Sequence, residues 1–265
     1  MTGGKSAGGR QSLRYCHTWG RARGAAASGR RPARVCWWGR KGAGVGDARI
    51  IYEDEVLLAW DKPAGIIVHG DGTGARTLTD VVADHLAATG RADVRPQAVQ
   101  RLDADTTGLV LFSLDRATQP ALDAQVAGHV MEKTYLAVVA GRVPWAEKTV
   151  RQPVGRDRHD ARRMRVCRPG QGKPAETRLR RVAEKDGRTL FAVTLVTGRR
   201  HQIRVHLASL GHPIVGDPLY GGARSTSGLL LHAWREELDH PSGGGRLRLE
   251  TSWPTRLWPG RPEGL

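Results

Sequence analysis

Short strand-like segments dominate this sequence, and they restrict the folds open to the chain more than any other feature does. Each is a run of apolar or alternating residues bounded by turn residues, which is typical of strands. The segments with this pattern are 55–61, 66–69, 98–102, 108–114, 133–143, 177–183, 188–197 and 229–238. Because many strands joined by hairpins with few helices between them form antiparallel sheets, the sequence predicts an α+β domain with a mixed, mainly antiparallel sheet.

Helical periodicity is confined to a few segments. The helices are expected over 78–88, 115–129 and 201–210. Thr77 precedes the first helix, and Asp80 is placed for the reciprocal contact of a capping box. Gly211 and Pro213 are expected to end the third helix, because Gly is common just after a helix and Pro cannot continue one.

The charge of the chain favours a nucleic-acid partner. It carries 42 Lys or Arg against 26 Asp or Glu, a formal net charge of +16. Such an excess is typical of proteins that contact a phosphate backbone. The excess is uneven, because residues 1–46 hold ten of the basic residues and no acidic residue. Residues 47–265 are therefore only moderately basic.

Residues 1–46 form a separate compositional segment, rich in Gly, Ala, Ser and Arg and without a sustained helical or strand period. A segment with so little apolar content cannot bury a core, so we expect a disordered basic extension. Three interpretations of it stay open. It is a basic arm that contacts RNA, an organelle transit peptide, or a stretch without function that nucleotide bias has enriched in arginine.

Two further features bear on location and metals. No run approaches the roughly 18 apolar residues of a membrane span, so we expect a soluble protein. The cysteines, Cys16, Cys36 and Cys167, are odd in number and far apart in the sequence. This usage predicts a reducing cytoplasm and no structural metal.

Two separated segments carry the most informative chemistry. Residues 100–108, Gln-Arg-Leu-Asp-Ala-Asp-Thr-Thr-Gly, place Asp103 in the connection between two expected strands, where catalytic groups are often held. Residues 197–207 open the third expected helix with several arginines. A carboxylate held near arginine stays ionised and can act as a nucleophile or base, and arginines also suit a polyanion such as RNA. From the residues alone, Asp103 could instead cap the turn before Thr106.

Six ordered blocks across roughly residues 50–255 resemble the RluA family of pseudouridine synthases. They are DKPAGIIVH at 61–69, QRLDADTTG at 100–108, EKTYLA at 132–137 with Gly141, GKPAET at 172–177, TGRRHQIRVHL at 197–207 and GHPIVGDPLYG at 211–221. Six blocks in order rarely arise by accident. The resemblance implies the mixed, mainly antiparallel sheet of a pseudouridine synthase catalytic domain over residues 47–258, with a C-terminal tail at 259–265.

The resemblance also implies an isomerase that converts uridine in RNA to its carbon-linked isomer without a cofactor or metal. Asp103 would attack the substrate, and the uracil would be cleaved from ribose, turned over while bound and rejoined through carbon 5. Tyr135 matches the active-site tyrosine whose ring stacks on the uracil, and Arg204 matches the basic residue that pairs with the catalytic aspartate. Arg101 matches an arginine that can fill the gap left by the flipped nucleotide.

Other residues are expected to contact the RNA backbone. They are Arg200, His201 and Gln202 at the start of the third expected helix, and Arg162 and Arg163. The last two belong to an arginine-rich segment at 151–168, which we expect to be a loop that grips phosphates without reading sequence. The alternative is a flexible insertion that serves only solubility.

Two departures from the family pattern flank the catalytic position. Gln100 stands where family members usually have His, and Ala104 stands where a charged residue is usual. Both concern the packing of the loop and the choice of substrate. Two other functions stay open: an RNA-binding module or RNA chaperone that has lost catalysis, and a hydrolase using Asp103 and His201. The expected partner is ribosomal or transfer RNA, bound by a monomeric cytoplasmic protein.

Overall fold

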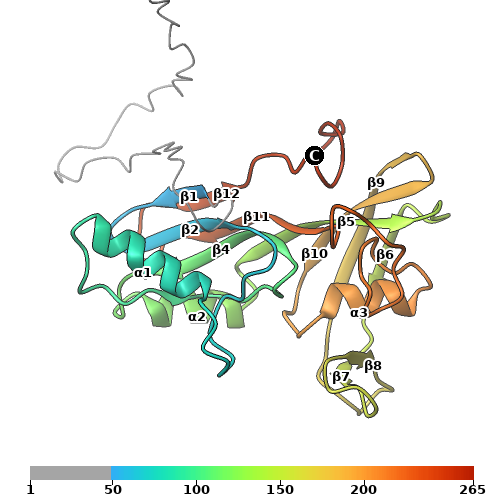
Figure 1. Ribbon diagram of the computed structural model, residues 1–265, viewed down its shortest axis with the longest axis horizontal. Helices are drawn as coiled ribbons and strands as arrows, with labels where there is room; N and C mark the ends of the chain where they lie inside the picture. The colour runs from blue at the N-terminus through green and yellow to red at the C-terminus, as the bar shows by residue number, and fades with distance from the viewer. Residues whose placement is uncertain (1–48) are drawn as a thin grey trace, which may run out of the picture. The chain divides into compact units, whose positions relative to one another are not determined.

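The computed structural model describes residues 49–265, with side chains from Ile50 onwards (Figure 1). The expected extension over residues 1–46 and its boundary with the domain lie outside the described residues. The helices are α1 (Leu78–Ala88), α2 (Gln119–Ala127) and α3 (Gln202–Ser209). The strands are β1 (Arg49–Glu53), β2 (Leu57–Lys62), β3 (Gln97–Ala98), β4 (Thr107–Ser113), β5 (Glu132–Ala140), β6 (Glu147–Val150), β7 (Val154–Arg156), β8 (Met164–Val166), β9 (Thr177–Lys185), β10 (Arg188–Leu195), β11 (Leu231–Asp239) and β12 (Arg246–Glu250).

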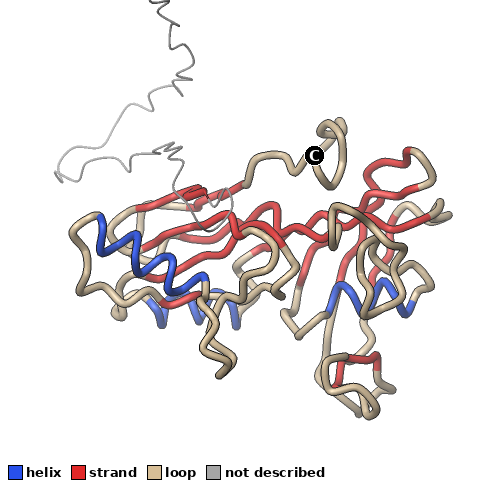
Figure 2. The backbone as a smooth tube through the Cα atoms, viewed as in Figure 1, coloured by secondary structure: helices blue, strands red, loops and turns tan. Residues whose placement is uncertain are grey.

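Within residues 49–265, ten strands form one sheet, which Figure 2 shows running through the domain. The strand order is β1-β2-β4-β11-β5-β10-β9-β6, with β3 beside β4 and β12 beside β11. Neighbouring strands are antiparallel except β4 and β11, which are parallel. β7 and β8 form a separate hairpin. The predicted α+β fold with a mixed, mainly antiparallel sheet is therefore confirmed.

Helix α1 begins and ends where its periodicity predicts. The Asp80 amide donates to Thr77 Oγ1, and the Asp80 carboxylate accepts from the Thr77 amide, so the capping box is formed. These contacts satisfy two amides that the first helical turn leaves without partners. Leu78, Val82 and Leu86 are buried on the inner face of the helix.

Helix α2 begins at Gln119, so the prediction of a start at Asp115 was wrong. The Asp115 carboxylate accepts from the Ala117 amide, and the Asp115 carbonyl accepts from the Thr118 amide. Aspartate favours such a local turn over a helix interior. Pro120 then occupies the first helical turn, where its missing N–H costs no hydrogen bond.

The first two helices cover opposite faces of the sheet. β2 alternates, with Leu58 and Trp60 in the same core cluster as α1, and Leu57 and Ala59 in a second cluster with Leu122 of α2. Because side chains along a strand point alternately to the two faces, each cluster covers one face. Helix α3 contributes Ile203 and Leu207 to the same cluster as α1. This packing holds the N-terminal end of α3, where the predicted site residues lie.

The strand predicted at 66–69 is absent. Its carbonyl groups serve other donors: Ile67 and Val68 accept from the first amides of α1, and Ile66 accepts from the Lys62 ammonium. β2 pairs with β1 and β4 instead. The sequence analysis also missed β1, β6, β7, β8 and β12. It overestimated the strand at 98–102, because β3 ends at Ala98 and shares only that residue with the prediction.

The chain beyond residue 258 lies against the sheet. The Arg261 guanidinium lies 4.9 Å from the centroid of the Trp234 ring and donates to Glu250. Leu265 is partly buried and packs against the main core, which includes Leu257 and Trp258. These contacts give residues 259–265 a defined place on the domain.

Gly108 permits the parallel pairing that joins the two halves of the sheet. It lies opposite Ala233 in the β4–β11 register and has a φ of +109°. A Cβ atom at this position would lie 2.1 Å from the Ala233 carbonyl oxygen. Only glycine fits both the positive φ and this approach of two backbones. Asp103 is on the loop that enters β4, so the pairing also anchors that loop.

We expect Gly108→Ala to destabilise the domain by about 3 kcal/mol or more, because the methyl group would separate β4 from β11. Chemical denaturation measures this loss. Gly70→Ala is the matched control, since a Cβ there meets no atom within 4 Å and its φ is not positive. Equal stabilities of the two variants would contradict the proposed contact.

Candidate active site

A cleft of about 1120 Å³ opens where the two halves of the sheet meet. Its walls are the loops that precede α1 and β4, the cleft-facing side of β5, and the segment that enters α3. Asp103, Tyr135, Arg101 and Arg204 all line it. Segments that are far apart in the sequence therefore converge on one concave surface, which is typical of a ligand site.

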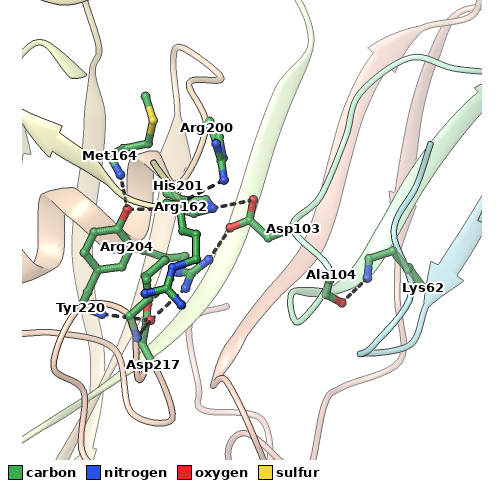
Figure 3. A network of polar contacts seen from close by, with 11 residues as sticks. Lys62, Asp103, Ala104, Arg162, Met164, Arg200, His201, Arg204, Asp217 and Tyr220 are labelled. Carbon is green, nitrogen blue, oxygen red and sulfur yellow. Dashed lines mark hydrogen bonds and ion pairs between the residues drawn. The ribbon is translucent and has the colours of Figure 1, made fainter. Parts of the chain in front are cut away.

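The structure brings Asp103 and Arg204 together, 101 residues apart in sequence (Figure 3). Arg204 Nη1 donates to Asp103 Oδ2 at 2.8 Å. A backbone hydrogen bond closes the turn after Asp103, since the Asp103 carbonyl accepts from the Thr106 amide. The carboxylate is thus directed at the guanidinium, and its side chain stays one quarter exposed to the cleft.

Asp217 holds Arg204 in place from the opposite side. Arg204 Nε and Nη2 donate to the two Asp217 oxygens at 2.7 and 2.9 Å, and the Asp217 side chain is fully buried. Burial opposes the charge of Arg204, but the hydrogen bonds to Asp217 and Asp103 outweigh it and raise its pKa above the ordinary value. A bidentate pair fixes the plane of the guanidinium, so Nη1 has one direction in which to donate.

Asp217 also organises its own loop. Its Oδ1 accepts from the amides of Leu219 and Tyr220. The sequence analysis quoted this loop as part of a block but gave Asp217 no role. The sequence did contain a signal for this role. Gly216, Asp217 and Pro218 are typical turn residues, and an aspartate in a turn often accepts hydrogen bonds from the amides that follow it.

His201 contacts the same cluster from the start of α3. Its Nδ1 lies 2.8 Å from the Tyr220 hydroxyl, and its Nε2 lies 3.7 Å from Asp103 Oδ1. Burial lowers its pKa, against the opposing effect of the Asp103 charge, so the ring is neutral at neutral pH. The Tyr220 hydroxyl also accepts from the Met164 amide, so Tyr220 links His201 to β8.

Lys62 holds the Asp103 loop through a hydrogen bond to its backbone. Its side chain is fully buried, and Nζ donates to the carbonyls of Pro63, Ile66 and Ala104 at 2.7 to 2.9 Å. Figure 3 shows the last contact, one residue after Asp103. Burial lowers the Lys62 pKa to about 8, against the opposing charges of Asp105 and Asp103. The sequence analysis quoted this lysine but did not assign it.

Tyr135 and Arg101 occupy different depths of the cleft. Tyr135 lies on β5 and is 6% exposed. Burial raises its pKa well above the ordinary range, and the charges of Glu236 and Asp103 add to this effect, so its hydroxyl stays protonated. Arg101 is exposed on the loop two residues before Asp103. One is a rigid aromatic wall and the other a cation at the rim.

The arginine-rich segment contains the β7–β8 hairpin, and Arg162 and Arg163 lie in the loop that joins its two strands. Arg162 is exposed and paired with Asp160, whose pKa it lowers to about 2 through hydrogen bonds. The Arg163 guanidinium lies 5.4 Å from the Tyr220 ring centroid, and Arg200 donates to the Arg162 carbonyl. These contacts bring the hairpin to the rim of the cleft and leave its charge exposed.

Gln202 lies in the interior, unlike the arginines that are predicted to contact RNA. It is 2% exposed, and its amide bonds to Thr197, Thr177, the Glu176 carbonyl and the Arg199 amide. It thereby joins the start of α3 to β9. Its donors and acceptor face protein groups, so its position is that of a structural crosslink.

Over residues 49–265, no cluster of three or more His, Cys, Asp or Glu side chains is placed to hold a metal ion. In the same part of the chain, no helix is long and apolar enough to cross a membrane.

We expect Asp217→Asn to lower the free energy of unfolding by about 3 kcal/mol, because breaking a buried ion pair leaves Arg204 with an uncompensated charge on that side. Denaturant titration measures the loss. Asp84→Asn is the control, since Asp84 pairs with Arg76 at the surface and such pairs contribute about 1 kcal/mol or less. A loss no larger than that of the control would show that the buried pair does not hold the site together.

Comparison with known proteins gives the chain its family. The model of the RNA pseudouridylate synthase family matches residues 56–209. The uncharacterized RNA pseudouridine synthase YhcT of Bacillus subtilis (strain 168) is 36% identical over 214 residues, which cover 80% of this chain and 70% of that protein. The ribosomal large subunit pseudouridine synthase D of Nitrosomonas europaea is 38% identical over 217 residues, which cover 78% of this chain and 62% of that protein.

Solved structures agree in fold. The human RNA pseudouridylate synthase domain containing 1 has a TM-score of 0.64 at 24% identity, covering 82% of this chain and 89% of that chain. The human RNA pseudouridylate synthase domain containing 4 has a TM-score of 0.65 at 22% identity, covering 78% and 89%. The fold, the convergent cleft and the matched sequence agree, and the chain belongs to the RNA pseudouridylate synthase family, whose members are isomerases that act on RNA.

Proposed function

We propose that this protein isomerises uridine to pseudouridine in RNA with Asp103 as the nucleophile. The observation that carries the proposal is the Asp103–Arg204 ion pair at the wall of the cleft. Arg204 forms an ion pair with the Asp103 carboxylate but does not block it, because Nη1 contacts only Oδ2 and the Asp103 side chain stays partly exposed. An ionised, oriented and accessible carboxylate has what a nucleophile requires.

The reaction needs no group besides the substrate and these side chains. Asp103 attacks, the bond between uracil and ribose breaks, and the uracil turns over while bound. The uracil is rejoined through carbon 5 with release of the Asp103 carboxylate, and the proton that carbon 5 loses is balanced by the proton that nitrogen 1 gains. Substrate and product contain the same atoms, so no electron or group is supplied from outside. Tyr135 provides the aromatic surface on which the uracil stacks, because its ring faces the cleft from a rigid strand.

The target nucleotide must leave its stack to reach Asp103. Enzymes that act on a base extrude it, which costs unstacking energy. Arg101 is exposed at the rim two residues before Asp103, and its planar guanidinium can fill the vacated space.

Arg200 and the hairpin arginines Arg162 and Arg163 contact the RNA phosphates on the other side of the cleft. His201 faces Asp103 and orients the carboxylate, and Gln202 supports the start of α3.

We infer that the substrate is ribosomal RNA. Several relatives are named ribosomal large subunit pseudouridine synthase D, from organisms that include Nitrosomonas europaea and Pseudomonas aeruginosa. Modification of transfer RNA has no comparable support, and a purely binding role gives no reason for the Asp103–Arg204–Asp217 arrangement. We propose that the protein acts as a monomer in the cytoplasm, with residues 47–258 as the catalytic domain.

We expect Asp103→Asn to abolish isomerisation while changing RNA affinity little, because the substitution keeps the size of the side chain and removes its charge. The measurement is pseudouridine mapping on ribosomal RNA from cells that express each variant, together with a binding titration of the purified proteins. Asp105→Asn is the control, since Asp105 is an exposed acid two residues away. Turnover by purified Asp103→Asn would refute the nucleophile.

We propose that the hairpin and residues 1–46 both add affinity through phosphate contacts. Replacing Arg162 and Arg163 with Ala should weaken RNA binding and reduce the slope of log Kd against log salt by about 1 to 2.

Deleting residues 1–46 should flatten the same slope without loss of thermal stability or turnover. Identical salt dependence in the truncated and full chains would leave the extension without a role in RNA binding.

A further inference from the structure

A buried carboxylate behind the cleft contacts the loop that carries Asp103. Glu236 on β11 is 1% exposed and accepts a hydrogen bond from Nε2 of Gln100. Gln100 is half-buried and lies three residues before Asp103. The proposed reaction does not use Glu236, and no structural ion pair of the described residues involves it.

A β-bulge places Glu236 on this side of the sheet. The register between β11 and β5 shifts between Ala233 and Arg235, so that Ala233 lies opposite Tyr135 and Glu236 lies opposite Lys133. Without the extra residue, alternation along β11 would direct Glu236 to the other face. The bulge therefore places the Glu236 carboxyl group on the same face of the sheet as Tyr135.

Two buried atoms of this contact have no partner. Gln100 Oε1 and Glu236 Oε2 are both shielded from solvent and make no hydrogen bond with the described residues. If Glu236 is ionised, both atoms are acceptors and cannot bond to each other. A single proton on Oε2 makes it a donor to Gln100 Oε1, while Gln100 Nε2 donates to Glu236 Oε1. One proton thus satisfies both atoms, and buried polar atoms are rarely left unsatisfied.

The surroundings favour the protonated form. Burial raises the pKa of Glu236 to about 7, against the lowering effects of the Lys133 charge and the Gln100 hydrogen bond. On β5, the groups that face it are Lys133 and the protonated Tyr135. On β12, its register partner is the apolar Leu249. Lys133 is only partly buried, so solvent screens its charge.

We propose that Glu236 is a positioning residue that carries a proton and holds Gln100, and with it the Asp103 loop, through a reciprocal acid–amide pair. The effect on turnover rests on Asp103 being the nucleophile, whereas the pair itself does not. Gln100 is one of the departures from the family pattern, and the pair explains how this chain anchors the loop with glutamine at that position.

The sign of the pH dependence follows from the raised pKa. Glu236 binds its proton more tightly in the folded than in the unfolded chain, so its contribution to stability is complete below the unfolded value. That contribution is lost as the pH rises through about 7. Above this pH the carboxylate faces Gln100 Oε1, one hydrogen bond is lost, and the loop is held less firmly.

The test compares Glu236→Gln with the wild type in the full chain. A glutamine at 236 forms the same reciprocal pair at every pH, because its amide both donates and accepts. We expect the thermal midpoint of the wild type to fall, relative to this variant, by at least about 4 °C between about pH 5 and about pH 8. Glu237→Gln is the control, since that neighbour lies opposite Glu132 and Arg248 in the strand registers.

Infrared spectroscopy gives a readout that does not depend on activity. The wild type should show the carbonyl band of a protonated carboxyl group that disappears with rising pH and is absent from Glu236→Gln. Gln100→Leu, which tests the pair from the other side, should lower kcat by about tenfold or more with RNA Kd nearly unchanged.

The outcomes separate the two proposals. A Glu236→Gln variant with the pH dependence and spectrum of the wild type would overturn the acid–amide pair. Loss of stability in Glu236→Gln at every pH would also overturn it, because it would show that the charge is required. If the pair is found but Asp103→Asn still turns over substrate, the proposed nucleophile fails and the assignment of the pair stands.

Discussion

The organisation of the cleft depends on one buried guanidinium held between two carboxylates. Asp217 takes two of the donors of Arg204 and leaves Nη1 for Asp103. Because Asp217 is fully buried and its own loop amides bind Oδ1, the guanidinium cannot rotate without breaking several hydrogen bonds at once. The direction of the Asp103 carboxylate therefore depends on Asp217, which does not line the cleft.

The loop that carries Asp103 is fixed at each end and in the middle. Gln100 contacts Glu236, Ala104 accepts from Lys62, and Gly108 pairs closely with Ala233. Glu236 and Ala233 lie on β11 and Lys62 lies at the end of β2, so the sheet determines the position of the loop from two of its strands. Such support is what a reacting group needs, because small displacements from productive geometry cost large factors in rate.

Charge is arranged in two zones around the cleft. The deep zone contains the compensated Arg204, a neutral His201 and the protonated Tyr135, where unpaired charge would be costly. The rim carries exposed arginines, of which Arg162 and Arg163 stand on the β7–β8 hairpin. Tyr220 joins the two zones, since its hydroxyl contacts both His201 and the Met164 amide of the hairpin. Phosphate contacts and chemistry are thus carried by adjoining but distinct groups.

The sequence by itself determined what local patterns encode: the sheet-rich fold class, the capped helix α1, and Asp103, Tyr135 and Arg204 as members of recognisable motifs. The predictions of a strand at 66–69 and of a helix start at Asp115 were wrong. Apolar runs and periodicity contain no information on the hydrogen bonds that compete for the same backbone groups. Only the tertiary structure showed Asp217, Lys62 and Glu236 as partners of the site. Their roles come from burial and from contacts with residues far away in the chain, and neither property is written in the neighbouring residues.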